Sequence, residues 1–237
     1  MAKWATLLLA FSAPLFALGK RSFHEIQVDN ELRRLDNLFT TADDYHIQTG
    51  DALPPYIPPP LLNGTVNLPI NHFGPSPSPY TFKNRFWVVD EYYKPGGPVF
   101  TLDTGESDDG YAYKGYLLKN TSFINKYLRD FNGLGILWEH RYYGQSTPYP
   151  VNLDTTSEQF QWLTTDQALE DFAVFARGFK WRIGGPDAKV QGKTSLVGKV
   201  VDFNPKKTPW VHVGGSYPGM RAAMLRNKYP DVIYACK

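Results

Sequence analysis

Residues 209–220 of the 237-residue chain read PWVHVGGSYPGM, and this stretch decides the fold. The apolar run Trp210–Val213 predicts a short strand, and residues 217–228 predict a helix that begins where the strand ends. Ser216 lies between them, at a sharp turn with unfavourable backbone angles that holds its hydroxyl clear of the sheet. The pattern therefore predicts that Ser216 is a catalytic nucleophile. The alternative is a structural serine in a glycine-rich turn, as in a nucleotide-binding fold.

Three glycines surround this serine and are predicted to form the elbow with it: Gly214, Gly215 and Gly219. Gly214 and Gly219 stand where the turn leaves no room for a side chain. The usual G-x-S-x-G pattern has glycine at position 218, where this chain has Pro218. Proline suits the first turn of a helix, because the leading amides there have no helical partner.

The start of the predicted helix supplies the candidate oxyanion hole. Its free amides and its dipole favour negative charge, so the Tyr217 amide is expected to face the oxyanion. A second donor usually comes from the loop after an earlier strand. That loop is residues 103–107, and Gly105 or Glu106 is the candidate. One such donor is worth about 3 kcal/mol of the barrier.

The rest of the chain predicts an α/β architecture with a largely parallel sheet and helices on both faces. Strands are expected at 82–89, 98–102 and 135–138, and helices at 120–131 and after Thr164. Thr164 and Gln167 form a capping-box pattern. The apolar positions at helical spacing that follow indicate a core-facing surface: Leu169, Phe172, Phe175 or Ala176, and Phe179. Residues 181–209 have weak periodicity and make an unusually long connection.

Composition narrows the chemistry. Lys plus Arg is 25 and Asp plus Glu is 23, so the net charge of +2 gives no case for nucleic acid or an anionic membrane surface. The single cysteine, Cys236, excludes a disulfide within the chain and a multi-cysteine zinc site. The five histidines have no paired spacing. We therefore expect no metal and no cofactor.

The amino terminus indicates secretion. Residues 1–19 resemble a signal peptide, with Lys3 before an apolar run too short to span a bilayer. Residues 20–66 are interpreted as a proline-rich pro-segment or linker, and 67–237 as the globular domain. Sequons at Asn63 and Asn120 predict glycosylation. After signal cleavage we expect no membrane association.

Several runs of the sequence, in order along the chain, resemble the serine carboxypeptidase family of lysosomal Pro-Xaa carboxypeptidase and dipeptidyl peptidase II. These runs are residues 71–73, 85–88, 95–100, 139–146, 163–171 and 209–219. The resemblance implies an α/β-hydrolase fold with a helical cap, a Ser-Asp-His triad with Ser216 as nucleophile, and peptide substrates cleaved near proline at their ends. It implies a secreted or a lysosomal or vacuolar destination.

Two departures from the family qualify this expectation. Residues 181–208 are longer than the family's connection, and the sequence stops at Lys237, before the positions where the family has its triad Asp and His. His140 and His212 are interpreted as structural histidines. The chain is therefore predicted to be an amino-terminal part of the fold, truncated after the elbow and inactive alone, or a mis-spliced sequence.

Another α/β-hydrolase activity, such as esterase or lipase, and a non-catalytic secreted glycoprotein remain alternatives. The direction of attack on the peptide and the oligomeric state stay open.

Overall fold

The computed structural model describes residues 56–74, 79–191 and 194–237. The chain divides into two units, residues 1–38 and 39–237, and every described residue belongs to the second. The predicted signal peptide and most of the proline-rich stretch lie outside the described residues.

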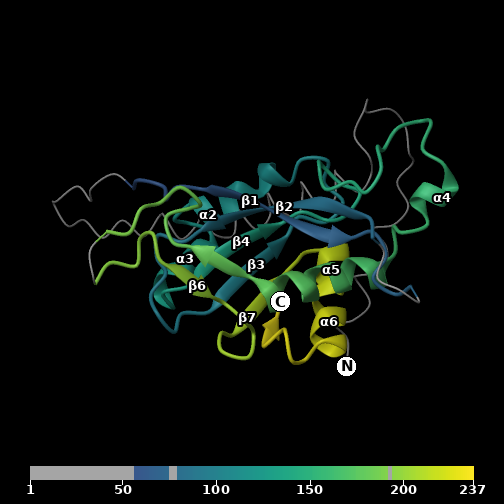
Figure 1. Cartoon of the computed structure of the whole chain (residues 1–237). Coiled ribbons are helices and arrows are strands. Elements are labelled where there is room, and N and C mark those ends of the chain that lie inside the picture. Colours follow the sequence, from purple (N-terminus) through teal and green to yellow (C-terminus); the bar gives the residue numbers. More distant parts are fainter. Residues whose placement is uncertain (1–55, 75–78, 192–193) are drawn as a thin grey trace, which may run out of the picture. The chain divides into compact units, whose positions relative to one another are not determined.

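A six-stranded sheet forms the centre of the described unit, with the strand order β1-β2-β4-β3-β7-β8 (Figure 1). The pairs β3–β4, β3–β7 and β7–β8 are parallel, whereas β1 and β2 join as an antiparallel hairpin and β2 runs antiparallel to β4. The sheet is therefore mixed and mostly parallel, as predicted. The strands are β1 (Leu62–Pro69), β2 (Thr81–Val89), β3 (Val99–Asp103), β4 (Leu134–Trp138), β7 (Trp210–Val213) and β8 (Ala235–Cys236).

Helices cover both faces of this sheet. Successive strand residues point to opposite faces, so Val88 belongs to one buried cluster and its neighbours Trp87 and Val89 to another. The first cluster packs against α5 and α6 and is rich in aromatic rings; the second packs against α2 and α3. The helices are η1 (Gly110–Lys114), α2 (Gly115–Leu118), α3 (Phe123–Asp130), α4 (Ser157–Phe160), α5 (Thr165–Gly178) and α6 (Tyr217–Lys228). The short α4 lies at the periphery, away from the strands (Figure 1).

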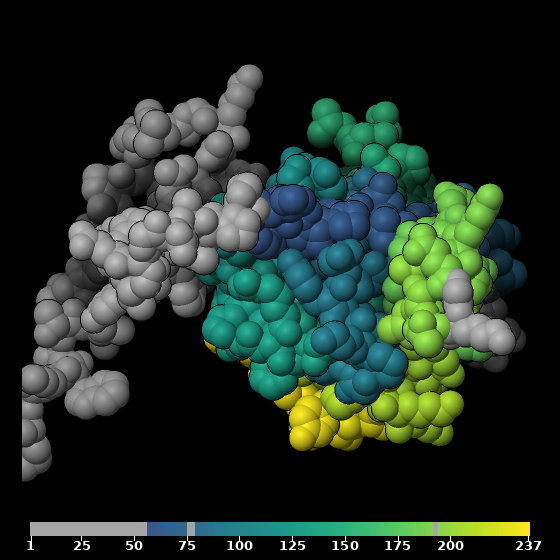
Figure 2. Space-filling view, turned by 90° about the vertical axis from the view of Figure 1, so that its left-hand side faces the viewer, coloured from purple at the N-terminus to yellow at the C-terminus, as the bar shows by residue number. Residues whose placement is uncertain are grey.

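The long connection after α5 forms a small second sheet of its own. β5 (Lys180–Arg182) pairs antiparallel with β6 (Val200–Asp202). Asp90 fastens this segment to the main sheet by accepting hydrogen bonds from Trp181 Nε1 at 2.7 Å and Gly184 N at 2.8 Å. In Figure 2 its yellow-green atoms form one band beside the blue atoms of the β1–β2 hairpin. The weak periodicity of this segment thus reflects a short hairpin held by a few buried anchors.

The structure differs from the expectation at three places. β1 begins at Leu62, so the sheet starts within the range interpreted as pro-segment or linker. Thr164 caps α5 by accepting from Gln167 N at 3.3 Å, but the Gln167 side chain bonds to Asn71 and His72, so the predicted reciprocal half of the capping box is absent there. A complete capping box is found at Thr156 and Gln159, before α4. The Gln167 side chain instead binds residues 71 and 72, in the segment between β1 and β2.

Candidate active site

Ser216 occupies the turn between β7 and α6. Its backbone has φ 57° and ψ −128°, a conformation that costs a non-glycine residue on the order of 1–3 kcal/mol. The residue is exposed, and its carbonyl accepts the first helical bond from Met220 N at 3.1 Å. The strained turn leaves Ser216 exposed at the carboxyl end of β7, the position expected of a nucleophile of this type.

The neighbouring glycines differ in how tightly they are enclosed. A Cβ added to Gly214 would lie 2.3 Å from the Pro218 carbonyl carbon, and one added to Gly219 would lie 3.0 Å from the Gly214 oxygen. A Cβ at Gly215 would meet no atom within 4 Å. Gly214 is therefore required by the close approach of strand and helix, whereas the space around Gly215 is open.

This contrast gives a matched pair of variants. We expect Gly214→Ala to lower the free energy of unfolding by about 1–3 kcal/mol, because the new methyl group must displace the Pro218 backbone. Gly215→Ala should change it by less than about 0.5 kcal/mol. Thermal or urea unfolding of both variants checks this; equal stabilities would show that strand and helix do not approach as closely as the structure has them.

The loop after β3 lies against the start of α6. Gly105 has φ 60°, and a Cβ there would lie 2.4 Å from Pro218 Cγ, so the loop and the elbow are in direct contact. The Gly105 amide donates to Asp103 Oδ1 at 2.9 Å. Of the two predicted donors in this loop, Gly105 is thus directed at a carboxylate within its own turn, which makes the Glu106 amide the better candidate.

Tyr217 opens α6, so its amide is one of the leading amides that have no partner within the helix. Its side chain is held from two sides. The hydroxyl lies 3.2 Å from His140 Nε2, and the guanidinium of Arg221 lies 5.6 Å from the ring centre. These contacts restrict the conformation of the Tyr217 side chain, and the amide of the same residue is the first candidate oxyanion donor.

The described histidines near the elbow have other partners than Ser216. His140 Nδ1 lies 2.6 Å from the Arg141 carbonyl oxygen and therefore donates to it, which leaves Nε2 to accept from Tyr217. His212 Nδ1 pairs with Thr101 Oγ1 at 2.7 Å. In the part of the chain that the structure describes, no histidine ring is hydrogen-bonded to the Ser216 hydroxyl.

Both histidines are neutral at physiological pH. Burial, reinforced by the charge of Arg221, lowers the pKa of His140 from its ordinary value of 6.5 to about 3. Burial also lowers the pKa of His212, against the opposing effect of Asp103. Both side chains are buried. Their environment suits a structural role, the interpretation made from the sequence.

The pKa of His140 makes stability depend on pH. The pKa of His140 is lower in the folded protein than in the unfolded chain. The contribution of neutral His140 to the free energy of unfolding is therefore complete above pH 6.5 and is lost as the pH falls toward 3. Between roughly pH 4 and 5.5 the unfolded chain binds one more proton at this residue, which steepens the loss by about 1.4 kcal/mol per pH unit. The free energy of unfolding, measured with urea at a series of pH values, should change with pH less steeply in His140→Gln, by about that amount. Parallel slopes for the two proteins would contradict a neutral buried His140.

The other predicted site residues are accessible, and their modification stays a prediction. Asn63 lies on the edge strand β1 and Asn120 lies in the turn before α3, and both are exposed. Within the described ranges, no three His, Cys, Asp or Glu side chains are grouped so that they could hold a metal ion. None of the helices described here is both long and apolar enough to cross a membrane.

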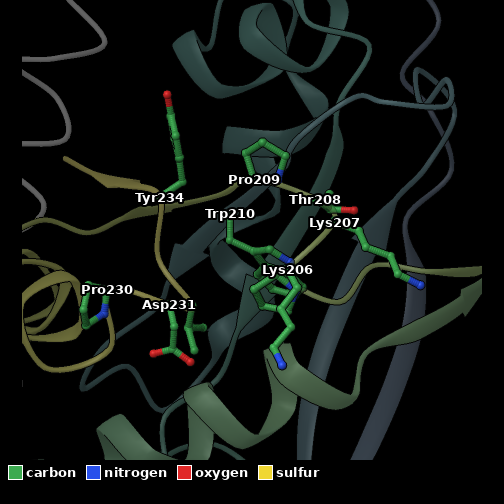
Figure 3. A pocket seen from close by; sticks show the side chains of 10 residues that line it. Lys206, Lys207, Thr208, Pro209, Trp210, Pro230, Asp231 and Tyr234 are labelled. Atoms are coloured by element: carbon green, nitrogen blue, oxygen red, sulfur yellow. The ribbon is translucent and has the colours of Figure 1, made fainter.

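A pocket of about 220 Å³ lies at the far end of β7 from Ser216. Its lining comes from the loop before β7 and from the segment after α6 (Figure 3). Trp210, the first residue of β7, is part of that lining, whereas Ser216 follows the last residue of the same strand. This pocket is therefore separate from the elbow.

Sequence reasoning missed the buried charges that surround the elbow. Arg221 and Asp103 form an ion pair of 2.7 Å in which neither side chain is exposed. Asp171, which is not among the apolar positions expected to face the core, is also buried and binds Arg141 and His72. A signal existed for Arg221, because it falls at helical spacing with Pro218 and Leu225, which are both buried.

Comparison with known proteins places these features in a family. Residues 69–190 and 196–236 match the profile described as serine carboxypeptidase S28. The profile omits only residues 191–195 of the long connection after α5. Together with the sheet order, this match confirms the predicted α/β-hydrolase fold.

Individual relatives agree with the profile. The chain is 34% identical over 175 residues to "Probable extracellular serine carboxypeptidase" of Arthroderma benhamiae, covering 72% of this chain and 22% of that protein. It is 30% identical over 230 residues to lysosomal Pro-X carboxypeptidase of Homo sapiens, covering 96% of this chain and 38% of that protein. The chain thus spans less than two fifths of the length of these relatives. With its matched profile over more than half of its residues, the chain belongs to the serine carboxypeptidase S28 family.

Proposed function

We propose that the protein is a serine exopeptidase that hydrolyses peptide bonds next to proline at the ends of peptides. The observation that carries the proposal is Ser216, exposed at φ 57° between β7 and α6 in a chain of the S28 family. The relatives' names include Pro-X carboxypeptidase and serine carboxypeptidase, which favours removal of residues from the carboxyl end.

The chemistry follows from the position of the serine. Ser216 Oγ attacks the scissile carbonyl carbon and gives up its proton to a general base, which returns it to the leaving amine. The oxyanion that forms is stabilised by the amides of Tyr217 and Glu106. Water then hydrolyses the acyl-enzyme. The three histidines that the structure describes have hydrogen-bond partners other than Ser216.

The destination of the protein is part of the proposal. Relatives are named as extracellular and lysosomal, and residues 1–19 have the composition of a signal peptide. We propose a secreted or a lysosomal or vacuolar glycoprotein modified at Asn63 and Asn120, which are both exposed. Treatment of the secreted protein with an amidase that removes N-glycans should lower its mass, and replacing both asparagines by glutamine should abolish that change.

The activity is tested with the full-length protein and two sets of peptides. One set has a blocked amino end and proline as the penultimate residue; the other has a free amino end and proline at the second position. Hydrolysis of the first set alone supports a carboxypeptidase, and of the second set alone a dipeptidyl peptidase. If the protein hydrolyses simple esters but neither set of peptides, the peptidase proposal is contradicted. That result would favour an esterase, whose nucleophile can lie in the same kind of elbow.

A further inference from the structure

Asp103 connects two elements of the candidate active site through its two carboxylate oxygens. It is the last residue of β3. Oδ1 accepts a hydrogen bond from the Gly105 amide at 2.9 Å, and Oδ2 lies 2.7 Å from Arg221 Nη1 on α6. One side chain therefore fixes the loop after β3 and also binds the helix that begins at the elbow.

Arg221 carries this connection to the elbow itself. Its Nη2 donates to the Ala168 carbonyl at 3.3 Å, which ties it to the first turn of α5 as well as to Asp103. Its guanidinium lies over the ring of Tyr217, and the Tyr217 hydroxyl in turn contacts His140. The contacts form a continuous chain from the candidate donor loop to the residue that follows the nucleophile.

The charges in this cluster favour the ionised pair. Burial is the largest single influence and would raise the pKa of Asp103, but the Arg221 guanidinium is the main group that opposes it, and the pKa lies well below its usual range. His212 Nε2 lies 3.6 Å from Oδ2, too far for a hydrogen bond. Since His140 and His212 are both neutral, Arg221 is the cation that balances the carboxylate.

We propose that Asp103 is a positioning residue, which through Arg221 holds the Gly105–Glu106 loop and the Tyr217 amide at the spacing that an oxyanion requires. This inference rests on the proposed peptidase function. A buried ion pair contributes little net stability compared with a well-packed apolar pair, so its consequence here is geometric. Donors to an oxyanion act over a narrow range of distances, and a displacement of about 1 Å can cost 10²-fold in rate.

The test compares Asp103→Asn with Asp90→Asn in the full-length protein. Asp90 is also buried, and it also accepts from one backbone amide and one side chain. It follows β2, whose end pairs with the start of β4, and so lies at the opposite edge of the sheet from Ser216. Both variants should lose stability. We expect only Asp103→Asn to lower kcat, by about 10- to 100-fold, with KM changed less than about twofold.

A second variant separates positioning from folding. Asp103→Asn with Arg221→Met removes both charges, so it should recover thermal stability relative to the single change. It should keep the low kcat, because the loop and the helix are no longer joined. Amide exchange at Gly105 and Tyr217 should be faster than in the wild type in this double variant and unchanged in Asp90→Asn. If Asp103→Asn does not fold, the double variant supplies the kinetic comparison.

The outcomes distinguish this inference from the function on which it rests. A wild-type protein that hydrolyses no peptide, and whose Ser216 does not react with a fluorophosphonate, would overturn both. An active wild type with an inactive Ser216→Ala, together with wild-type kcat in the Asp103 variants, would overturn the positioning role alone. Loss of kcat in Asp90→Asn equal to that in Asp103→Asn would also overturn it, by showing a general effect of destabilisation.

Discussion

Replacing Ser216 by alanine is expected to lower kcat of the full-length protein by on the order of 10⁵- to 10⁶-fold, with little effect on stability. The loss is large because the hydroxyl oxygen forms the acyl-enzyme bond, and the oxyanion donors alone retain only a small residual rate. Stability should be preserved because the residue is exposed and alanine removes one atom from the surface. We expect Tm to move by less than about 2 °C.

Two measurements check this result. Steady-state hydrolysis of the preferred proline peptide gives the rate loss, and labelling by a fluorophosphonate followed by mass analysis of the labelled peptide identifies the reacting serine. Ser157→Ala is the control, since Ser157 is exposed at the start of the peripheral α4 and its hydroxyl donates to Glu158 Oε1 at 3.2 Å. Comparable labelling of Ser216→Ala and the wild type would place the nucleophile elsewhere.

The elements around Ser216 could be predicted because local signals agree there. The bounds of β7 and α6 coincide with the predicted Trp210–Val213 and Tyr217–Lys228. A continuous apolar run, two glycines and a proline in the first helical turn all favour the same boundary. The elbow is thus encoded within about twenty neighbouring residues, and no distant contact is needed to recognise it.

Elements that depend on distant partners could not be predicted in this way. β1 follows a proline-rich stretch, and Gly64 interrupts its alternation of apolar and polar residues; pairing with β2 completes the strand. β5 and β6 are three residues each and exist because they pair with one another. Sequence patterns report burial and propensity, and these segments are ordered mainly by tertiary contacts.

The buried charges escaped prediction for a related reason. A sequence shows that Asp103 and Arg221 are present but not that they meet, and charged residues are by default assigned to the surface. The one local indication that a charged residue is buried is its position on the buried face of a helix, and Arg221 has such a position on α6. Because an unpaired buried charge is so costly, an arginine on such a face indicates a carboxylate elsewhere in the fold. Arg141 had no such local indication, because it lies in the turn after β4.

Arg141 is expected to give the largest stability effect of a single substitution. All five of its N–H groups have acceptors, and the side chain has no exposed surface. Nε and Nη2 donate to the two oxygens of Asp171 at 2.6 and 2.8 Å. The remaining hydrogens go to backbone carbonyls at the end of β1 and before α5, namely those of Pro69, Ile70 and Trp162.

Arg141→Met should lower the free energy of unfolding by about 3–5 kcal/mol or more, since it leaves Asp171 buried without its cation and three carbonyls without their donor. That is a large share of the roughly 5–15 kcal/mol that stabilises a folded domain. Arg141→Lys keeps the charge but offers three donors from a single point, so it should be intermediate. Asp171→Leu combined with Arg141→Met should cost less than the sum of the two single changes.

The exposed pair Lys126–Asp130 is the control, because its separation of 2.5 Å is even shorter than that of Arg141 and Asp171. Its side chains are 62% and 46% exposed, and water screens the attraction between them. Lys126→Met should therefore change stability by less than about 0.5 kcal/mol. Urea unfolding of the wild type and of these variants measures the contrast, and the secreted yield of Arg141→Lys reports on the site if Arg141→Met does not fold. If Lys126→Met and the Arg141 variants lost the same free energy of unfolding, burial would not determine how much an ion pair contributes to stability. The same argument for Asp103 and Arg221 would then be wrong as well.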